Sequence, residues 1–255
     1  MGGVGGNGRG GPGAGRQGGP GAGALLTRDE VGAMFDAVAP RYDLLNRVLS
    51  LGVDGRWRRA AVRALGLRAG DLLVDICGGT GDLAFEAERQ VPGVRTLNLD
   101  LSRPMLARHA RRASRRAAAA RGVVGDAMRL PLRSGCARAA VVGFGIRNLP
   151  DRLLALGEIH RALAPGGRLA VLEFALPEAA AVRRPYLLYL RHLVPRIAAL
   201  LSPSAAAYRY LGQSILAFPS PAEFAALVER AGFAEVSVRP LSRGIAVCYL
   251  AAKAA

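Results

Sequence analysis

The stretch Leu72-Leu73-Val74-Asp75-Ile76-Cys77-Gly78-Gly79-Thr80-Gly81-Asp82 decides the fold of this 255-residue chain. Its first five residues form a short apolar run, which is typical of a strand buried on both faces of a parallel sheet. The glycines that follow allow a sharp turn into a helix expected from Leu83 to Gln90. The pattern predicts a βα unit whose glycine loop binds a ligand, and an ordinary βα turn is the alternative.

Strands and helices alternate in the residues after this loop. Helices are expected at 102–120 and 151–163, the second closed by a turn at 164–167, and two or three more between 183 and 230. The remaining strands are expected at 96–100, 123–124, 139–144, 168–174, 236–238 and 245–250, the last two as a hairpin around 242–244. This alternation predicts a Rossmann-like, doubly wound, seven-stranded and mainly parallel α/β sheet. The helical insertion after the fifth strand is expected to lie over the carboxyl ends of the strands.

The residues before the first strand divide into two parts. Residues 1–24 are mostly glycine and cannot bury enough apolar surface to offset the entropy of ordering, so we expect a flexible tail. Apolar residues at helical spacing predict helices at 31–38, 42–49 and 55–65. We therefore expect one domain over residues 25–255, with a helical cap before the sheet.

The charge of the chain is strongly positive, with a formal net charge of +16. Such a charge favours nucleic acid or an anionic membrane as a partner. However, Lys253 is the only lysine among 35 basic residues, and this arginine bias is typical of a GC-rich genome. Part of the positive charge then results from mutational drift and not from selection for a binding surface. An arginine-rich surface is still attracted to anionic lipid headgroups.

Cysteines and histidines give no sign of a metal site. The three cysteines, Cys77, Cys136 and Cys248, are far apart and form no CxxC pair, which indicates reduced thiols and a cytoplasmic protein. The three histidines lack metal-ligand spacing, and we expect each on a helix surface or at a core edge. No secretory signal is visible, and the most apolar long stretch, Val182–Leu201, carries too many charges for a membrane span.

Acidic residues near the strand ends indicate which ligand the loop binds. Asp100 ends the second strand, where a carboxylate can accept hydrogen bonds from the ribose hydroxyls of a nucleoside. Asp75 and Asp82 flank the loop and would repel the pyrophosphate of a dinucleotide, so they favour a cationic sulfonium ligand. Gly125-Asp126-Ala127 follows the third strand, and its acid is either a contact to the adenine amine or a simple turn residue.

Six ordered blocks of sequence resemble the UbiE/MenG family of quinone-biosynthesis C-methyltransferases. The similarity extends from about Val31 to Leu250. Its blocks are 34–46, 49–59, 78–83, 143–149, 163–174 and 208–215, and the hallmark among them is Gly143-Phe144-Gly145-Ile146-Arg147-Asn148-Leu149. Six blocks in the right order are far more specific than a single glycine motif.

The resemblance implies a class I S-adenosylmethionine-dependent methyltransferase fold and assigns residues to its site. A serine is common in the family at the position of Gly143, so one cofactor contact differs here. Three residues are implied for catalysis: Arg147 would stabilise an aryloxide, Asn148 would orient the ring oxygens and Tyr42 would close the site from the helical cap. The cofactor contacts are implied at Asp75, Gly78, Gly79, Thr80, Gly81, Asp100, Leu101, Asp126, Ala127 and Gly143, with no metal.

Alternatives to these roles follow from the residues themselves. Arg147 is otherwise a surface arginine that caps the next helix, and Asn148 is otherwise its N-cap, in competition with Asp151. Tyr42 and Trp57 are otherwise core aromatics of the helical cap, and for Trp57 we favour the core.

The resemblance also implies the reaction, which is methylation of a ring carbon on a polyprenylated quinol. Demethylmenaquinol is the favoured acceptor, and the ubiquinone precursor is not separated from it by the sequence. Leu187–Leu201 with its flanking arginines is either an amphipathic contact to the inner face of a membrane or a helix packed on the sheet. A homodimer is a further candidate assembly, and no nucleic acid is expected. The competing functions are methylation of another small lipophilic acceptor and non-enzymatic nucleic-acid binding by the arginines.

Overall fold

The computed structural model describes residues 2, 36, 50, 52–116, 118, 121–193, 196 and 205–255. The expected tail at 1–24, the boundary at residue 25 and the helix expected at 42–49 lie outside the described residues. Of the helix expected at 31–38 only Asp36 is described, and it is helical.

Seven strands form one sheet in the order β3-β2-β1-β4-β5-β7-β6, which confirms the predicted Rossmann-like α/β fold. Strands β1 to β5 pair in parallel, whereas β7 is antiparallel to both β5 and β6. The order reverses between β1 and β4, and ligands of such sheets bind at this point beyond the carboxyl ends of the strands. The bounds are β1 (Leu72–Ile76), β2 (Arg95–Asp100), β3 (Arg121–Val124), β4 (Ala137–Gly143), β5 (Leu163–Phe174), β6 (Ala234–Leu241) and β7 (Ala246–Ala252).

Helices cover both faces of the sheet and build two separate hydrophobic cores. Trp57 of α3 belongs to the first core, together with Leu73 of β1 and Leu83 of α4. Leu156 of α6 and Phe224 of α10 belong to the second core on the other face. The helices are α3 (Asp54–Ala64), α4 (Asp82–Gln90), α5 (Arg103–Arg116), α6 (Arg152–Ala162), α7 (Ala180–Leu188), α9 (Ala205–Leu216) and α10 (Pro221–Arg230).

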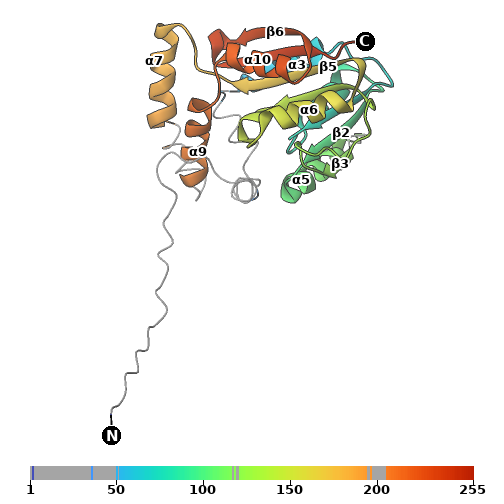
Figure 1. Cartoon of the computed structure of the whole chain (residues 1–255), viewed down its shortest axis with the longest axis horizontal. Coiled ribbons are helices and arrows are strands. Elements are labelled where there is room, and N and C mark those ends of the chain that lie inside the picture. The colour runs from blue at the N-terminus through green and yellow to red at the C-terminus, as the bar shows by residue number, and fades with distance from the viewer. Residues whose placement is uncertain are drawn as a thin grey trace.

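Short helical turns connect several of these elements. A 3-10 turn, η2 (Ile146–Asn148), follows β4, and another, η4 (Ser242–Gly244), forms the expected hairpin between β6 and β7. A π-helical turn, η3 (Tyr189–Leu193), continues α7. The insertion helices α7 and α9 lie beyond one end of the sheet, on the left in Figure 1, and α9 contacts η2.

One expectation about local structure is wrong. The predicted turn at 164–167 lies inside β5, where the pairing jumps from Ala137–Leu163 to Ala139–Arg168 and leaves the intervening residues as a bulge. Of the two positions expected for His109, the structure excludes the helix surface, because His109 is fully buried against Phe85 of a small core cluster, with ring centroids 5.0 Å apart. No helix among the described residues is both long and apolar enough to cross a membrane.

Candidate active site

The glycine loop after β1 makes room for the protein's own buried side chains. A Cβ on Gly78 would lie 2.0 Å from Oδ1 of Asn98, and one on Gly81 would lie 2.1 Å from Nδ1 of His109. Gly79 and Gly81 also have φ values of 55° and 86°, in the left-handed region that favours glycine. Steric exclusion therefore explains Gly78 and Gly81, and backbone conformation explains Gly79.

Asp75 lies beneath this loop and is fully buried. The backbone N–H of Ala84, in the first turn of α4, donates to Oδ2 of Asp75 at 3.0 Å. Burial raises the pKa of Asp75 to about 7. Among the described residues, Oδ1 of Asp75 and Oδ1 of Asn98, its neighbour on β2, have no hydrogen-bond partner. The structure thus places Asp75 as a support for the loop and the start of α4.

Thr80 and Asp82 face away from the crevice, toward α5. Nη1 of Arg112 donates to the Thr80 hydroxyl at 2.7 Å, and Nη2 of Arg112 lies 2.5 Å from Oδ1 of Asp82. Arg58 lies 3.3 Å from the other Asp82 oxygen. Burial opposes ionisation of Asp82, but Arg58 and Arg112 outweigh it and lower its pKa. The argument that the charge of Asp82 selects the ligand is therefore wrong, because two arginines neutralise that charge.

A largely apolar pocket opens at the carboxyl ends of β1, β2 and β4. Leu99 and Met105 contribute apolar lining, and Phe144 lies on the β4 side. The predicted residues that line it are Gly79, Asp100, Leu101, Asp126, Ala127 and Asn148. Those that the structure places outside the lining are Asp75, Gly78, Thr80, Gly81, Gly143 and Arg147.

Asp100 and Asp126 supply the acidic groups of this pocket. The backbone N–H groups of Gly79 and Ser102 each donate to Asp100 at 2.8 Å, so this carboxylate fixes the glycine loop against β2. Burial raises the pKa of Asp100 in spite of these bonds. Asp126 accepts from the N–H of Met128 at 2.9 Å. The lining contains no Lys or Arg among the described residues, so the pocket offers no cation to a pyrophosphate.

Backbone strain marks the β4 side of the same pocket. Cys77 and Phe144 have φ values of 54° and 58°, which are uncommon for residues with side chains. A Cβ on Gly145 would lie 2.5 Å from Cβ of Cys77, so the two loops touch at this glycine. At Gly143, where the family often has serine, a Cβ would lie 2.5 Å from Cδ1 of Leu83. Leu83 thus occupies the space that the missing side chain would need.

Arg147 is held in a buried ion pair at the edge of this site. Its Nη1 lies 2.7 Å from Oε1 of Glu173, and its backbone N–H donates to Oε2 at 3.3 Å. Arg147 is 6% exposed and Glu173 is fully buried in β5. A second bond from Nη1 goes to the carbonyl oxygen of Phe144, whereas Nε of Arg147 has no partner among the described residues. The interpretation of Arg147 as a surface arginine is therefore wrong.

The other predicted catalytic residues have different outcomes. Asp151 caps α6 by accepting from the N–H of Leu154 at 2.9 Å, so the alternative of Asn148 as the N-cap is wrong. Asn148 lines the pocket, and its buried Oδ1 has no partner within the described part of the chain. Tyr42 lies outside the described residues. Trp57 is 4% exposed and packs against Phe174, which confirms it as a core aromatic.

Sequence reasoning missed three residues around Arg147. Glu173 lies in the family block 163–174. It is an acid inside an otherwise apolar strand, and this could have indicated a buried ion pair, because a buried charge requires a partner. Tyr186 of α7 and Tyr210 of α9 are both buried, and burial raises both pKa values while Arg147 partly opposes it. The helical insertion therefore supplies phenol groups to the electrostatic surroundings of Arg147. Tyr210 lies in the block 208–215, but nothing in that block indicates that it is near Arg147.

The described residues contain no group of three or more His, Cys, Asp or Glu side chains that could hold a metal ion. The sheet order, with β7 inserted antiparallel between β5 and β6, and the pocket at its switch point are those of the class I S-adenosylmethionine-dependent methyltransferase fold. A solved S-adenosylmethionine-dependent methyltransferase from Thermotoga maritima superposes with a TM-score of 0.63 over 87% of this chain and 99% of that chain, at 20% identity.

The chain belongs to the ubiE/COQ5 methyltransferase family, whose model matches residues 24–253. It is similar to the demethylmenaquinone methyltransferase of Thermus thermophilus, with 42% identity over 85% of this chain and 98% of the relative. It is also similar to the ubiquinone/menaquinone biosynthesis C-methyltransferase UbiE of Syntrophotalea carbinolica, with 44% identity over 85% of this chain and 91% of the relative. The family predicted from the six sequence blocks is confirmed.

Proposed function

We propose that this methyltransferase transfers a methyl group from S-adenosylmethionine to a ring carbon of a polyprenylated quinol, with demethylmenaquinol as the favoured acceptor. The observation that carries the proposal is the buried Arg147–Glu173 pair next to Asn148, at the border of the pocket. The names of the family's curated relatives support a quinone pathway, and they include both menaquinone and ubiquinone biosynthesis.

The residues of the pocket fit S-adenosylmethionine. Asp100 at the end of β2 would accept from ribose hydroxyls, and Asp126 after β3 would accept from the adenine amine, since both line the pocket. Leu101 and Ala127 would pack against the adenosine, and Gly79 would let it approach the main chain. When bound, S-adenosylmethionine supplies an electrophilic methyl group. Asp75, Gly78, Thr80, Gly81 and Gly143 would act on the ligand indirectly, through the shape of the loops.

Arg147 would stabilise the acceptor in its reactive form. A quinol ring carbon becomes a good nucleophile when the adjacent hydroxyl loses its proton, and a fixed cation favours the resulting aryloxide. The unpartnered Nε–H of Arg147 is a donor suited to that oxygen, and the unpartnered Oδ1 of Asn148 is an acceptor suited to a second ring hydroxyl. Glu173 would be a positioning residue, because it holds the guanidinium without touching the acceptor. Arginine stays protonated at neutral pH, so the proton would pass to water or to an acid nearby.

The tail of the acceptor would leave over the helical insertion. Leu188 of α7, Leu193 of η3 and Leu216 of α9 are large apolar side chains with 60%, 46% and 43% exposure. Exposed leucines close to the acceptor side offer an apolar path for a polyprenyl chain. The protein would then work in the cytoplasm as a peripheral protein on the inner face of the membrane.

A labelled-transfer experiment tests the proposal. The protein is incubated with S-adenosylmethionine labelled in the methyl group and with either demethylmenaquinol or the demethylated ubiquinone precursor, and the label is located in the product by NMR. We expect label on a ring carbon of demethylmenaquinol. Label on a ring oxygen, or transfer to neither quinol, would contradict the proposal and favour another lipophilic acceptor.

A further inference from the structure

A groove separate from the cofactor pocket lies between α3, α4 and α5. It encloses about 1450 Å³, and none of its lining residues lines the cofactor pocket. We call it the arginine groove, because its lining includes Arg58, Arg89, Arg108, Arg111, Arg112, Arg115 and Arg116.

The distribution of charge does not fit a uniform excess of arginine. Helix α5 carries six arginines and no acidic residue in 14 residues. On the opposite face of the sheet, α6 has two arginines and one glutamate, and α10 has one arginine and two glutamates. Mutational drift from codon usage acts on all helices alike, so it does not explain the concentration on α5.

The positions within α5 place these charges on one side. Arg108, Arg111, Arg112 and Arg115 follow a spacing of three and four residues, which aligns them along one helix face. Like charges at this spacing destabilise an isolated helix. The macrodipole compensates for Arg115 in the last turn but not for Arg111, which is exposed and farther from the end. An exposed arginine whose charge the helix does not favour is consistent with a role in binding.

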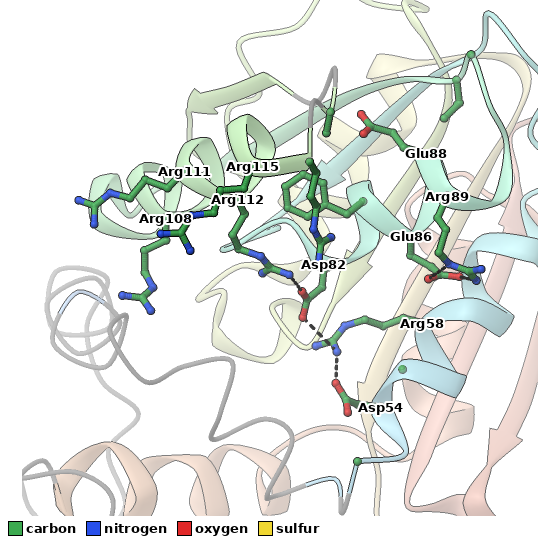
Figure 2. A pocket seen from close by; sticks show the side chains of 17 residues that line it. Asp54, Arg58, Asp82, Glu86, Glu88, Arg89, Arg108, Arg111, Arg112 and Arg115 are labelled. Carbon is green, nitrogen blue, oxygen red and sulfur yellow. Dashed lines mark hydrogen bonds and ion pairs between the residues drawn. The ribbon is translucent and has the colours of Figure 1, made fainter.

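The arginines of the groove form an inner and an outer set. Arg112 contacts Thr80 and Asp82, and the guanidiniums of Arg112 and Arg116 lie 5.2 Å and 4.8 Å from the ring centroid of Phe85. Ion pairs also occupy two further acids of the floor, since Asp54 pairs with Arg58 and Glu86 with Arg89, whereas Glu88 accepts from the Thr96 hydroxyl. In Figure 2, Arg112 points toward Asp82, whereas Arg108 and Arg111 point away from it, toward the outer edge.

We propose that the outer arginines of this groove, Arg108, Arg111 and Arg115, bind the phosphate headgroups of an anionic membrane. Guanidinium groups match phosphate oxygens in bidentate geometry, and a bilayer rich in anionic lipid attracts such a cluster. The inference rests on the proposed function, because a polyprenylated acceptor resides in the bilayer and the enzyme has to reach it there. The groove then acts as a membrane-docking site on α5, distinct from the exposed leucines of the insertion.

The groove is less suited to RNA than to lipid headgroups. Single-stranded nucleic acid usually stacks its bases on exposed aromatic rings. Phe85 is the aromatic residue among the described lining residues, and it is 6% exposed and covered by Arg112 and Arg116. An arginine surface without an accessible ring matches the chemistry of a headgroup.

Vesicle flotation with the full chain tests the site. Wild type is compared with the triple variant R108Q/R111Q/R115Q on two kinds of vesicle. One contains phosphatidylcholine alone, and the other, the mixed vesicle, also contains about 30 mol% phosphatidylglycerol. Each arginine near an anionic surface contributes roughly a fivefold gain, so the triple variant should bind the mixed vesicles about a hundredfold more weakly. R108K/R111K/R115K should keep most of the binding, and R133Q/R230Q/R239Q, which changes three exposed arginines elsewhere, should keep it as well.

Three results would overturn the inference. The first is that wild type does not bind the mixed vesicles. The second is that the triple variant and its R133Q/R230Q/R239Q control lose vesicle binding equally. The third is that binding is lost in a further variant, R183Q/R184Q on α7, and not in the triple variant. Preferential binding of a duplex or single-stranded RNA over vesicles would identify nucleic acid as the partner instead. Methyl transfer to a short-tailed quinol in detergent separates this test from the proposed function. Wild type and the triple variant should turn it over equally, and failure of wild type to do so would refute the proposed function whatever the vesicles show.

Discussion

The cofactor pocket and the arginine groove lie on opposite sides of the same short loop, and their chemistry is opposite. Gly79 lines the pocket, while Asp82, three residues later, lines the groove. The pocket combines apolar side chains with two carboxylates and has no basic residue among its described lining. The groove has seven arginines, and ion pairs hold three of its four acids, Asp54, Asp82 and Glu86. One loop thus separates a site suited to a cationic nucleoside from a site suited to anions.

The arginines of the two regions differ in burial and in partners. Arg147, beside the pocket, is 6% exposed and bound to one fully buried carboxylate. Arg111 and Arg115 in the groove are exposed on the outer side of α5. A buried pair has a defined geometry and is sensitive to loss of either partner, whereas exposed charges act collectively and are screened by salt. Single substitutions should therefore disable the pocket region, whereas the groove should respond to several at once.

Removal of the Arg147 guanidinium should have the largest effect. Arg147→Ala is expected to lower kcat on a short-tailed quinol about 10²- to 10³-fold, as for loss of one donor to an oxyanion. The dissociation constant for S-adenosylhomocysteine should change little, because Arg147 does not line the cofactor pocket. Single-turnover kinetics and calorimetry measure the two quantities.

Glu173→Gln tests whether the partner acts through Arg147. The amide can still accept a hydrogen bond but lacks the charge, so kcat should fall by roughly tenfold, less than in Arg147→Ala. In the double variant the effects should not add, since both residues serve one group. Arg89→Ala, which breaks an exposed pair with Glu86, is the matched control. Equal losses of turnover and cofactor affinity in Arg147→Ala would contradict the assigned role.

Substitution of Asp100 should have the next largest effect. Asp100→Ala is expected to weaken S-adenosylhomocysteine binding about a hundredfold, because it removes a charged acceptor for two ribose hydroxyls and frees the N–H of Gly79. Asp126→Ala should weaken S-adenosylhomocysteine binding roughly tenfold, because it removes one hydrogen-bond acceptor. Isothermal titration calorimetry measures both, with the exposed Glu229→Ala as control. Unchanged affinity in Asp100→Ala would place the nucleoside elsewhere.

The sequence predicted the sheet well because its signal is local. The apolar run from Leu72 to Ile76 coincides with β1, and the acids at the ends of β2 and β3 line the pocket as expected. Of the two catalytic residues that the family blocks imply here, Asn148 lines the pocket and Arg147 does not, and their catalytic roles stay predictions. These successes depend on residues close in the chain, or on a rule for where parallel strands end.

The failures concern pairs of residues that are distant in the chain. Thr80 was expected to contact the ligand and the charge of Asp82 to select it, but Arg112 on another helix bonds to both of them. The partnership of Arg147 with Glu173 spans 26 residues and helix α6, so no spacing rule reveals it. The sequence left His109 between a helix surface and a core edge, because its burial depends on Gly81, whose lack of a side chain admits the imidazole. Tertiary contacts decided each of these cases.

Asp75 should give a moderate, pH-dependent effect on stability. Its folded-state pKa of about 7 lies above the ordinary aspartate value of 3.8, so the folded state binds the proton more tightly than the unfolded state. The stabilisation is complete below pH 3.8 and is lost as the pH rises to 7. Asp75→Asn mimics the protonated acid. Its stability relative to wild type should therefore increase between pH 4 and 7 and level off above that range.

Urea unfolding at several pH values measures this difference. The subtraction of wild type from Asp75→Asn removes the contributions of other titrating groups. Asp71→Asn changes an exposed acid that accepts from the N–H of Arg68, and it serves as the control. If the difference in unfolding free energy between Asp75→Asn and wild type stays constant across this pH range, Asp75 has the same pKa in the folded and the unfolded protein.

Arg112 connects the two regions, and its substitution should have the smallest effect. Arg112→Gln removes the bond to the Thr80 hydroxyl and the ion pair with Asp82, both next to the cofactor loop. A net hydrogen bond of about 1 kcal/mol corresponds to about a fivefold increase in KM for S-adenosylmethionine, with kcat on a short-tailed quinol unchanged. Arg116→Gln also removes a cation–π contact to Phe85 but does not touch the loop, so its KM should stay at the wild-type value. If both variants keep the wild-type KM for S-adenosylmethionine, the groove and the pocket are independent. A KM increase confined to Arg112→Gln would mean that an anion bound near Arg112 can influence cofactor binding through Thr80.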